Sequence, residues 1–305
     1  MKLLRSMLAA FLRSAPSFKG KGRIARIVNN AFNYFGAEPI VSAQMKNGTQ
    51  MRLDLRAETE FPTYYTGDYD ENLLRQAVLF TGKDGVFVDV GANIGFWSVA
   101  VGHFIKQGGG SGRVLSFEPL LENHQRLVEN IALNQLSQIC AAYHLGLSDS
   151  AREAGLVLRK DFSAGSNTGN ASIAIHDRID KGFKSVKIKL ARFDDEWGPL
   201  EVEYKKIDFI KVDIEGHEDY FLAGAAKALQ KYRPVILLEV NKFFYEARGV
   251  DVDRVLRESM PPHYLIFKKQ GRHWKEIHSF DECSNVDNVF LAPEENGQIK
   301  KMHGI

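Results

Sequence analysis

From residue 86 onward, short apolar runs rich in β-branched residues alternate with segments whose apolar residues recur at helical spacing. Because parallel strands must be joined by crossover connections, this alternation predicts an α/β fold, a mostly parallel sheet with helices on both faces. The expected strands are 86–90, 113–117, 139–147, 209–213 and 235–240, and the expected helices are 96–105, 121–133 and 219–230. Two later runs, 263–268 and 288–291, flank a polar stretch around Gly271 and Trp274. They are expected to pair antiparallel and close a seven-stranded sheet.

Three shorter segments precede this region. Residues 40–55 predict a β-hairpin, because Asn47-Gly48 suits a tight turn between β-prone flanks. Residues 60–69 are expected to form an ordered loop, since Pro and Gly interrupt an aromatic and polar stretch. Residues 70–80 have the apolar spacing of a helix.

A long insertion lies between residues 149 and 193. It carries a Ser/Asn/Gly tract at 163–172, flanked by β-like segments at 155–159 and 186–190. A loop of this length in a compact domain is usually functional or disordered.

Charge and cysteine content narrow the classes of function. The 40 Lys/Arg and 38 Asp/Glu give a net charge of +2, without the basic excess typical of proteins that bind nucleic acid, so no nucleic-acid partner is expected. Cys140 and Cys283 have neither metal-ligand spacing nor the density of a disulfide scaffold, which predicts reduced thiols in a cytoplasmic protein. No residue is assigned as a metal ligand. No segment approaches the roughly 20 apolar residues of a membrane span.

Residues 1–37 form a basic leader. Two cations precede the apolar run 7–12, as in a signal peptide, but the run is too short and Arg13 interrupts it. The cations of the leader are Lys2, Arg5, Arg13, Lys19, Lys21, Arg23 and Arg26. This pattern predicts a basic amphipathic helix that either packs on the domain or touches the anionic inner face of a membrane, and the sequence leaves both interpretations open.

The stretch 89–95 (DVGANIG) joins the first strand of the alternating region to its helix. Gly91 and Gly95 carry no side chain that would keep a ligand from the backbone, and the loop is expected to offer N–H groups to it. A dinucleotide fingerprint, G-x-G-x-x-G, would need glycine in place of Asn93. S-adenosylmethionine has no phosphate and carries a sulfonium and an ammonium group, so Asp89 at the strand end favours it. The alternative is a structural turn with an incidental Asp.

Glu118 follows the second strand, 23 residues beyond Gly95. A carboxylate at this place can accept hydrogen bonds from both hydroxyls of a ribose. Taken alone, the residue is equally compatible with a solvated loop charge.

A third group of acids, 213–218 (DIEGHE), follows the fourth strand, at the edge where ligands bind in open α/β sheets. Glu239 and Asn241 end the fifth strand, so Asp213 and Glu239 are expected to face one crevice. The alternative interpretation of Glu218 is a helix-start charge favoured by the helix dipole.

Several of these stretches resemble motifs of the FkbM-type methyltransferases. They are 87–95 (FVDVGANIG), 117–119 (FEP), 146–149 (GLSD), 209–218 (FIKVDIEGHE), 65–71 (YTGDYDE), 130–134 and 167–173 (NTGNASI). The similarity spans roughly residues 38 to 293. The sequence departs from the family's pattern at 191–195 (ARFDD), where a Thr-Leu-Asp-like segment is expected.

The resemblance implies a class I (Rossmann-like) methyltransferase fold with S-adenosylmethionine as cofactor. The chain would divide into a basic helical segment (1–37), a hairpin and cap (38–82), the methyltransferase domain (83–293) and a tail (294–305). Carried over residue by residue, the cofactor site would contain Asp89, Gly91, Ala92, Asn93, Gly95, Glu118, Pro119, Ser148, Asp149 and Asp213.

The family methylates oxygen, which implies a hydroxyl acceptor on a sugar of a glycan, polysaccharide or glycolipid, or on a secondary metabolite. A hydroxyl is a weak nucleophile near neutral pH and benefits from a base, for which His217, Glu215 and Glu239 are the candidates. His217 has the suitable ordinary pKa, unless it faces outward from its helix. The rival interpretations are a methyltransferase acting on protein or RNA, a nicotinamide-dependent oxidoreductase, and a catalytically silent membrane-peripheral binding module.

Overall fold

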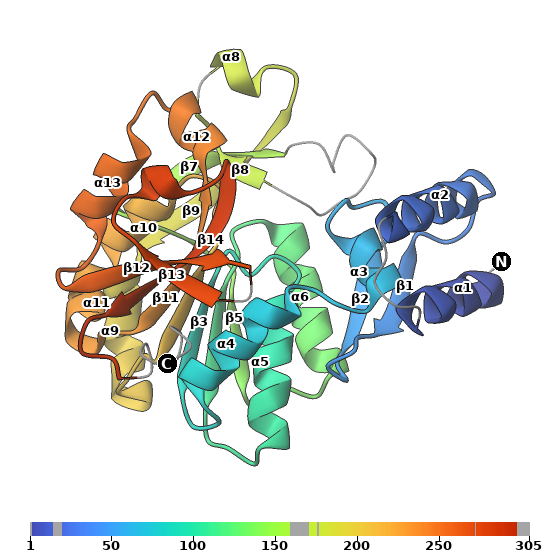
Figure 1. Ribbon diagram of the computed structural model, residues 1–305, viewed down its shortest axis with the longest axis horizontal. Coiled ribbons are helices and arrows are strands. Elements are labelled where there is room, and N and C mark those ends of the chain that lie inside the picture. Colours follow the sequence, from blue (N-terminus) through green and yellow to red (C-terminus); the bar gives the residue numbers. More distant parts are fainter. Residues whose placement is uncertain (1, 15–19, 159–170, 176, 272, 298–305) are drawn as a thin grey trace.

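The structure, a computed structural model, describes residues 2–14, 20–158, 171–175, 177–271 and 273–297 of the 305-residue chain. Within these residues, an eight-stranded sheet forms the main body, and a cap of helices and one hairpin projects from one side (Figure 1). The strands of this central sheet, in spatial order, are β13 (His273–Ile277), β12 (Tyr264–Gln270), β14 (Val286–Pro293), β11 (Val235–Asn241), β10 (Phe209–Val212), β3 (Val86–Val90), β4 (Arg113–Phe117) and β5 (Cys140–Tyr143).

The central sheet is parallel from β11 through β10, β3 and β4 to β5, so the predicted class I Rossmann-like fold is confirmed. β14 pairs antiparallel with both β11 and β12, which confirms the antiparallel closure. The described sheet nevertheless has one strand more than the seven expected. The stretch after Gly271 forms β13, because Trp274 and Ile277 turn inward and are buried among otherwise exposed neighbours.

Helices cover both faces of the central sheet. On one face, Phe87 and Phe209 pack with α4 (Glu71–Thr81), α5 (Phe96–Gln107) and α6 (Leu121–Leu133). On the other, Val88 and Ile210 pack with α9 (Phe193–Tyr204), α10 (Glu218–Gly224), α11 (Ala226–Tyr232) and α13 (Val252–Ser259). Successive residues of one strand therefore enter opposite clusters, and burial on both faces explains why these strands are mostly apolar.

The helices on this face differ from the expectation in two ways. The helix expected over 219–230 is divided into α10 and α11, which meet at Ala225. α9, α13 and α12 (Lys242–Ala247) were not expected from the sequence. α9 contains Gly198 and Pro199, which weaken a helical pattern, while α12 and α13 are too short for a clear one.

The cap begins with the hairpin predicted for residues 40–55. β1 (Ile40–Gln44) pairs antiparallel with β2 (Gln50–Asp54), and Gly48 in the turn takes φ +88°. The expectation of a loop at 60–69 is wrong, because α3 (Glu60–Thr66) lies there. Pro62 is tolerated because it lies in the first turn, where the backbone N–H has no partner within the helix. Gly67 ends α3 at φ +70°.

The basic leader forms two helices rather than one. They are α1 (Lys2–Ser14) and α2 (Lys21–Tyr34), and both contact α3. Packing of the leader on the rest of the chain, one of the two alternatives, is therefore confirmed for these helices. Among the described residues no helix is long and apolar enough to cross a bilayer.

The insertion adds a smaller sheet beside the central one. Its strands, in spatial order, are β6 (Gly146–Ser148), β9 (Lys184–Arg192), β7 (Arg152–Leu158) and β8 (Ala171–Ile173). The β-like segments flanking the insertion are thus confirmed, whereas the single strand expected over 139–147 is divided between β5 and β6. α8 (Asp177–Asp180) follows β8, and the short helix η1 (Phe280–Glu282) precedes β14. Most of the Ser/Asn/Gly tract lies outside the described residues.

The two cysteines lie on different elements. Cys140 belongs to β5 and Cys283 follows η1, and both are buried free thiols, as predicted. Burial raises the pKa of both thiols, to about 12 and about 11 respectively, so both are protonated at neutral pH.

Candidate functional site

A cleft lies at the carboxyl ends of β3, β4, β10 and β11 and encloses about 1100 Å³ of space between atoms, its open mouth included. Thr59 and Tyr69 of the cap form part of its wall, and Leu156, Ile173 and Leu190 of the smaller sheet form another part. The parallel strands all point their carboxyl ends to this edge, which is where open α/β sheets bind ligands.

The loop after β3 shapes one wall of the cleft. Gly91 takes φ +75°, and a Cβ atom there would lie 2.0 Å from the carbonyl oxygen of Asp213, so only glycine fits between the two strand ends. The N–H groups of Gly91 and Ala92 both donate to the carbonyl of Phe117 at 3.0 Å. The N–H of Asn93 donates to Glu118 Oε2 at 2.9 Å. The expectation that these three N–H groups serve a ligand is therefore wrong, because the protein itself uses them.

Glu118 is buried at the end of β4 and lines the cleft. Its Oε1 accepts the N–H of Leu120 at 2.9 Å, while Oε2 accepts that of Asn93. Burial raises the pKa of this carboxyl to about 7. Two backbone donors and the side chain of Asn123 thus fix the orientation of the carboxylate, which retains acceptor capacity for a ligand hydroxyl.

Lys211, in the middle of β10, was missed by the sequence reasoning. Its Nζ lies 3.2 Å from Asp213 Oδ2, 3.7 Å from Asp89 Oδ1 and 3.3 Å from the carbonyl oxygen of Gly91. Burial alone would lower the pKa of this amine, but the two carboxylates outweigh it and raise the pKa. The signal in the sequence is a single Lys in an apolar strand, two residues before Asp213 and therefore on the same face.

Asp89 lies behind the cleft rather than in its wall. Its side chain is fully buried, with Oδ2 accepting the Ser98 hydroxyl at 2.5 Å and Oδ1 facing Lys211. Burial raises its pKa. The register explains the pairing, since Asp89 and Lys211 are direct partners across β3 and β10. Asp89 thus reaches the cleft only through Lys211.

Three carboxylates meet at the carboxyl ends of β10 and β11, as expected for Asp213 and Glu239. One oxygen each from Asp213, Glu215 and Glu239 lies within 4.8 Å of the others. Repulsion by Asp213, together with burial and Glu215, raises the pKa of Glu239 to about 9. Even beside the ammonium group of Lys211, this acidic cluster therefore holds a proton at neutral pH.

The backbone between β10 and α10 is held in an unusual conformation that presents the acidic cluster. Glu215 and Gly216 take φ +54° and +84°, and Asn241 Nδ2 donates to Glu215 Oε2 at 3.2 Å. Glu218 Oε1 accepts the N–H groups of Ile214 and Gly216, and its Oε2 accepts the Tyr245 hydroxyl at 2.5 Å. Glu218 thus braces the turn from inside and is more than an exposed helix-start charge.

His217 lines the cleft and does not face outward. Its Nε2 lies 2.9 Å from the Ser148 hydroxyl, which also contacts Asp149 Oδ1 at 3.0 Å. The ring stacks on Tyr220 with centroids 4.4 Å apart. Burial lowers the pKa of His217 to about 4, so the imidazole is neutral at pH 7.

Tyr69 closes the cleft from the cap side. Its ring stacks on Phe96 with centroids 4.2 Å apart and an interplanar angle of 9°. Burial raises the pKa of the phenol well above its ordinary value, and Asp213 and Glu239 act in the same direction. The hydroxyl is therefore a hydrogen-bond donor beside the acidic cluster at any physiological pH.

The structure brings most of the predicted site residues into one wall. Those that line the cleft are Gly91, Ala92, Asn93, Glu118, Pro119, Asp213, Glu215, His217 and Glu239. Four others are not among the residues that line it: Asp89, Gly95, Ser148 and Asp149. Gly95 is the N-cap of α5 and takes φ +93°, a conformation that favours glycine, and a Cβ there would also crowd Leu127 Cδ1 at 2.6 Å.

Residues 89–272, more than half of the chain, match the model of the FkbM methyltransferase domain. The chain belongs to this family. FkbM methyltransferases use S-adenosylmethionine as methyl donor, so the predictions of a methyltransferase and of its cofactor are confirmed.

Individual relatives of this FkbM methyltransferase are distant. AMB antimetabolite synthetase AmbE of Pseudomonas aeruginosa is 29% identical over 210 residues, which are 59% of this chain and 9% of that protein. The crystal structure of methyltransferase FkbM from Methylobacillus flagellatus KT is 18% identical, with a TM-score of 0.41, over 76% of this chain and 52% of that one. TYW2 of P. horikoshii in complex with MeSAdo is 15% identical, with a TM-score of 0.44, over 88% and 80%. The chain thus spans about a tenth of the curated relative.

The geometry of the FkbM cleft fits a cationic donor without phosphate. The N–H groups of the loop after β3, which a pyrophosphate would need, are already used within the protein. Glu118 supplies an oriented carboxylate at one end, and the acidic cluster supplies negative charge at the other. The phosphates of a nicotinamide dinucleotide would not find these donors free, and the lysine that lines the cleft, Lys211, is already paired with Asp89 and Asp213.

Proposed function

We propose that the chain transfers the methyl group of S-adenosylmethionine to a hydroxyl oxygen, on a sugar of a glycan, polysaccharide or glycolipid or on a secondary metabolite. The observation that carries the proposal is the acidic cluster at the end of the cleft opposite Glu118. Carboxylates accept hydrogen bonds from hydroxyl groups and can remove their protons. A site that gathers three of them beside the phenol of Tyr69 suits a polyhydroxylated acceptor.

The donor orientation follows from the two ends of the cleft. Glu118 is placed to accept hydrogen bonds from the ribose hydroxyls, while Pro119 and the strand β6 border the adenine end. Gly91 allows close approach of the methionine portion, and Asp213 faces its ammonium group. Bound in this way, the donor supplies an already activated methyl group, so the protein contributes alignment and exclusion of water.

Glu239 is the best placed of the candidate bases. A carboxyl with a pKa of about 9 binds a proton strongly, and it ionises more readily beside a cationic donor. His217 is a weaker candidate, since its pKa of about 4 makes it a poor proton acceptor and Ser148 already contacts its Nε2. Glu215 is held by Asn241 and shares the acidic cluster with Glu239.

The test is an acceptor screen with S-adenosylmethionine labelled at the methyl group. Sugars, nucleotide-sugars and glycolipid extracts are offered beside peptides and RNA, and Glu118→Ala is the negative control. The expected product is a methyl ether on a hydroxyl oxygen. Label that enters only peptide or RNA, or a methyl group found on nitrogen, would contradict the proposal.

The assignment of the base has its own test. Glu239→Gln is expected to lower kcat by about 10²-fold or more, the usual contribution of a general base, whereas His217→Asn retains most turnover. Full turnover of Glu239→Gln with an unchanged pH profile would exclude Glu239. The same result for Glu215→Gln would exclude Glu215.

We also propose the division of the chain that the sequence indicates, since none of its boundaries divides a described helix or strand. The methyltransferase domain comprises 83–293, preceded by the cap (38–82) and the basic leader (1–37) and followed by a tail (294–305). Limited proteolysis is expected to release fragments at these boundaries.

We also propose a cytoplasmic location, supported by the two free thiols.

A further inference from the structure

The two leader helices present a second apolar face that the fold does not use. On α1 the large exposed side chains recur at helical spacing, Leu3 at 75% exposure, Met7 at 61% and Phe11 at 68%. On α2 they are Ile27 at 69% and Tyr34 at 86% exposure. Exposed apolar residues scattered singly are normal, but several of them gathered on two helices that contact each other indicate an interaction surface.

The opposite faces of the same helices are firmly attached to the cap. Arg5 of α1 is buried and donates to the carbonyl of Glu38, and its guanidinium lies 5.9 Å from the ring centroid of Phe32 in α2. Arg13 donates to the carbonyls of Tyr64 and Gln44 at 2.9 and 2.7 Å. Since both helices bury one face toward α3, their exposed apolar faces both point away from the molecule.

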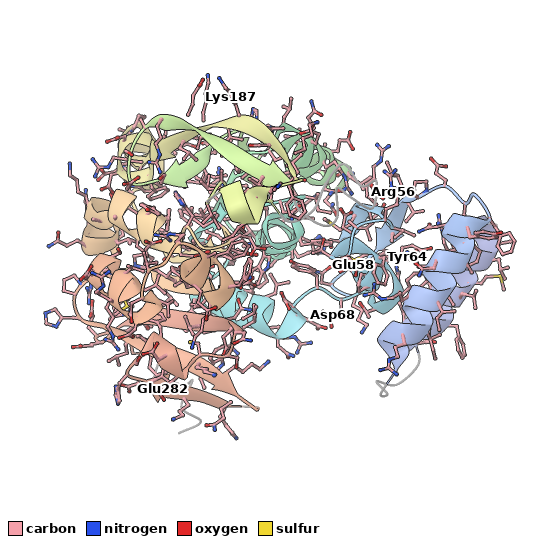
Figure 2. All side chains as sticks on the ribbon, turned by 90° about the horizontal axis from the view of Figure 1, so that it is seen from above. Arg56, Glu58, Tyr64, Asp68, Lys187 and Glu282 are labelled. Atoms are coloured by element: carbon pink, nitrogen blue, oxygen red, sulfur yellow. The ribbon has the colours of Figure 1, made fainter. Side chains whose placement is uncertain are left out.

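Figure 2 shows this arrangement from above. Tyr64 lies beside the α1–α2 pair, on the side that faces the rest of the protein, while other side chains project from the outer side of the pair. We call the surface made by Leu3, Leu4, Met7, Phe11, Ile24, Ile27, Tyr34 and Phe35 the outer face.

Charge separates the leader from the remainder of the chain. Residues 1–37 contain seven Lys/Arg and no Asp/Glu, whereas the rest contains 33 Lys/Arg and 38 Asp/Glu. Arg5 and Arg13 hydrogen-bond to carbonyl oxygens, which leaves their charges unneutralised, and Arg26 pairs with Glu58 at an exposed site. The outer face is therefore apolar and belongs to a segment of net positive charge, which attracts an anionic partner and repels a second copy of the same face.

We propose that the outer face of α1 and α2 is a docking surface for an anionic lipid bilayer. The helices lie in the plane of the interface, with Met7, Phe11 and Ile27 among the acyl chains and with Lys21 and Arg23 near the lipid headgroups. The proposal does not depend on the nature of the methyl acceptor.

The position of α3 links this surface to the cleft. α1 and α2 pack on α3, and the residues just outside the two ends of α3, Thr59 and Tyr69, line the cleft. Docking through the outer face would thus hold the cleft at a fixed distance from the bilayer, with its cap wall toward the lipid. An acceptor carried on a lipid would reach the site from that side.

The test measures binding of the full-length protein to vesicles of phosphatidylcholine, with and without anionic phosphatidylglycerol. The test variant is Met7→Gln/Phe11→Gln. The matched control is Leu79→Gln/Val202→Gln, which changes residues of 66% and 80% exposure on α4 and α9. Thermal unfolding by circular dichroism checks that all three proteins are folded.

We expect the wild type and the control to bind anionic vesicles alike, and the test variant to bind at least about tenfold more weakly, because it loses buried apolar area. Equal binding of the wild type and the test variant would overturn the proposal, as would wild-type binding that does not need phosphatidylglycerol. The wild type could instead fail to bind vesicles and form a dimer in analytical ultracentrifugation. If Met7→Gln/Phe11→Gln is then monomeric, the outer face binds a second copy of the chain and the proposal is overturned.

Discussion

Replacing Lys211 by Met removes the one described cation that lies between the carboxylates of β3 and β10 while keeping most of the packing of its stem. The side chain of Lys211 is 8% exposed, and it faces Asp89, whose side chain is 0% exposed, and Asp213, at 27%. Loss of one partner of a buried ion pair destabilises a protein by about 3–5 kcal/mol. Because Asp213 remains partly hydrated and Asp89 keeps its hydrogen bond from Ser98, we expect about 3 kcal/mol at pH 8.

The loss should depend on pH with a definite sign. Burial already raises the pKa of Asp89 above its ordinary value of 3.8, and removal of Lys211 raises it further. The folded variant then binds a proton that the unfolded chain releases, so its stability falls as pH rises above about 4. The difference between the variant and the wild type is therefore small near pH 4 and largest above pH 7.

Urea unfolding followed by tryptophan fluorescence measures both effects. Asp89→Asn should restore much of the stability of Lys211→Met, since the stranded charge is gone, with a coupling energy of about 2 kcal/mol in the double-mutant cycle. The reasoning is refuted if Lys211→Met is as stable as the wild type at pH 8. It is also refuted if the two substitutions simply add.

Three further predictions concern the cleft. Repulsion and burial raise the pKa of Glu239 from 4.5 to about 9, so the stability of the wild type should fall as pH rises through that window. Glu239→Gln should be more stable than the wild type by about 2 kcal/mol at pH 8 and equal to it near pH 4.5. A wild type whose stability does not fall in this way contradicts the raised pKa. Gly91→Ala should lose about 2–4 kcal/mol of stability, because its Cβ would lie 2.0 Å from a carbonyl oxygen. Gly109→Ala, at φ +59° with open space around it, should lose only the conformational part of about 1 kcal/mol. Equal losses of the two variants in urea unfolding would exclude the clash. Binding of S-adenosylmethionine should weaken as pH falls below about 7, where Glu118 becomes protonated. Glu118→Gln should bind S-adenosylmethionine weakly at every pH. If this variant shows the same pH dependence as the wild type, the role of Glu118 is contradicted.

The strands of the central sheet could be predicted because burial on both faces leaves a plain signal, a short apolar run ended by Gly or an acid. The loop after β3, Glu118 and the pair Asp213 and Glu239 could be placed for the same reason, since parallel strands bring their ends to one edge. β13 escaped prediction because only Trp274 and Ile277 mark it. α3 escaped prediction because Pro62 is typical of a loop, although the first turn of a helix tolerates proline.

Other features of the site depend on contacts that no local pattern contains. No local pattern shows that the N–H groups of Gly91, Ala92 and Asn93 have partners. They donate hydrogen bonds to Phe117 and Glu118, at the end of the neighbouring strand. The proton affinity of Glu239 arises from Asp213, which is distant in the chain and close only after folding. Likewise, the exposure of Met7 and Phe11 becomes meaningful only because the opposite side of α1 is already packed.

Calorimetric titration of the purified protein with S-adenosylmethionine, and separately with NAD, measures which of the two cofactors the protein binds. We expect S-adenosylmethionine to bind at one site per chain and NAD to give no heat of binding. Glu118→Ala should weaken donor binding by about 10–100-fold, the effect of losing hydrogen bonds to a charged acceptor. Binding of NAD instead of S-adenosylmethionine, or donor binding that is unchanged in Glu118→Ala, would contradict the assignment of this cleft as the methyl-donor site.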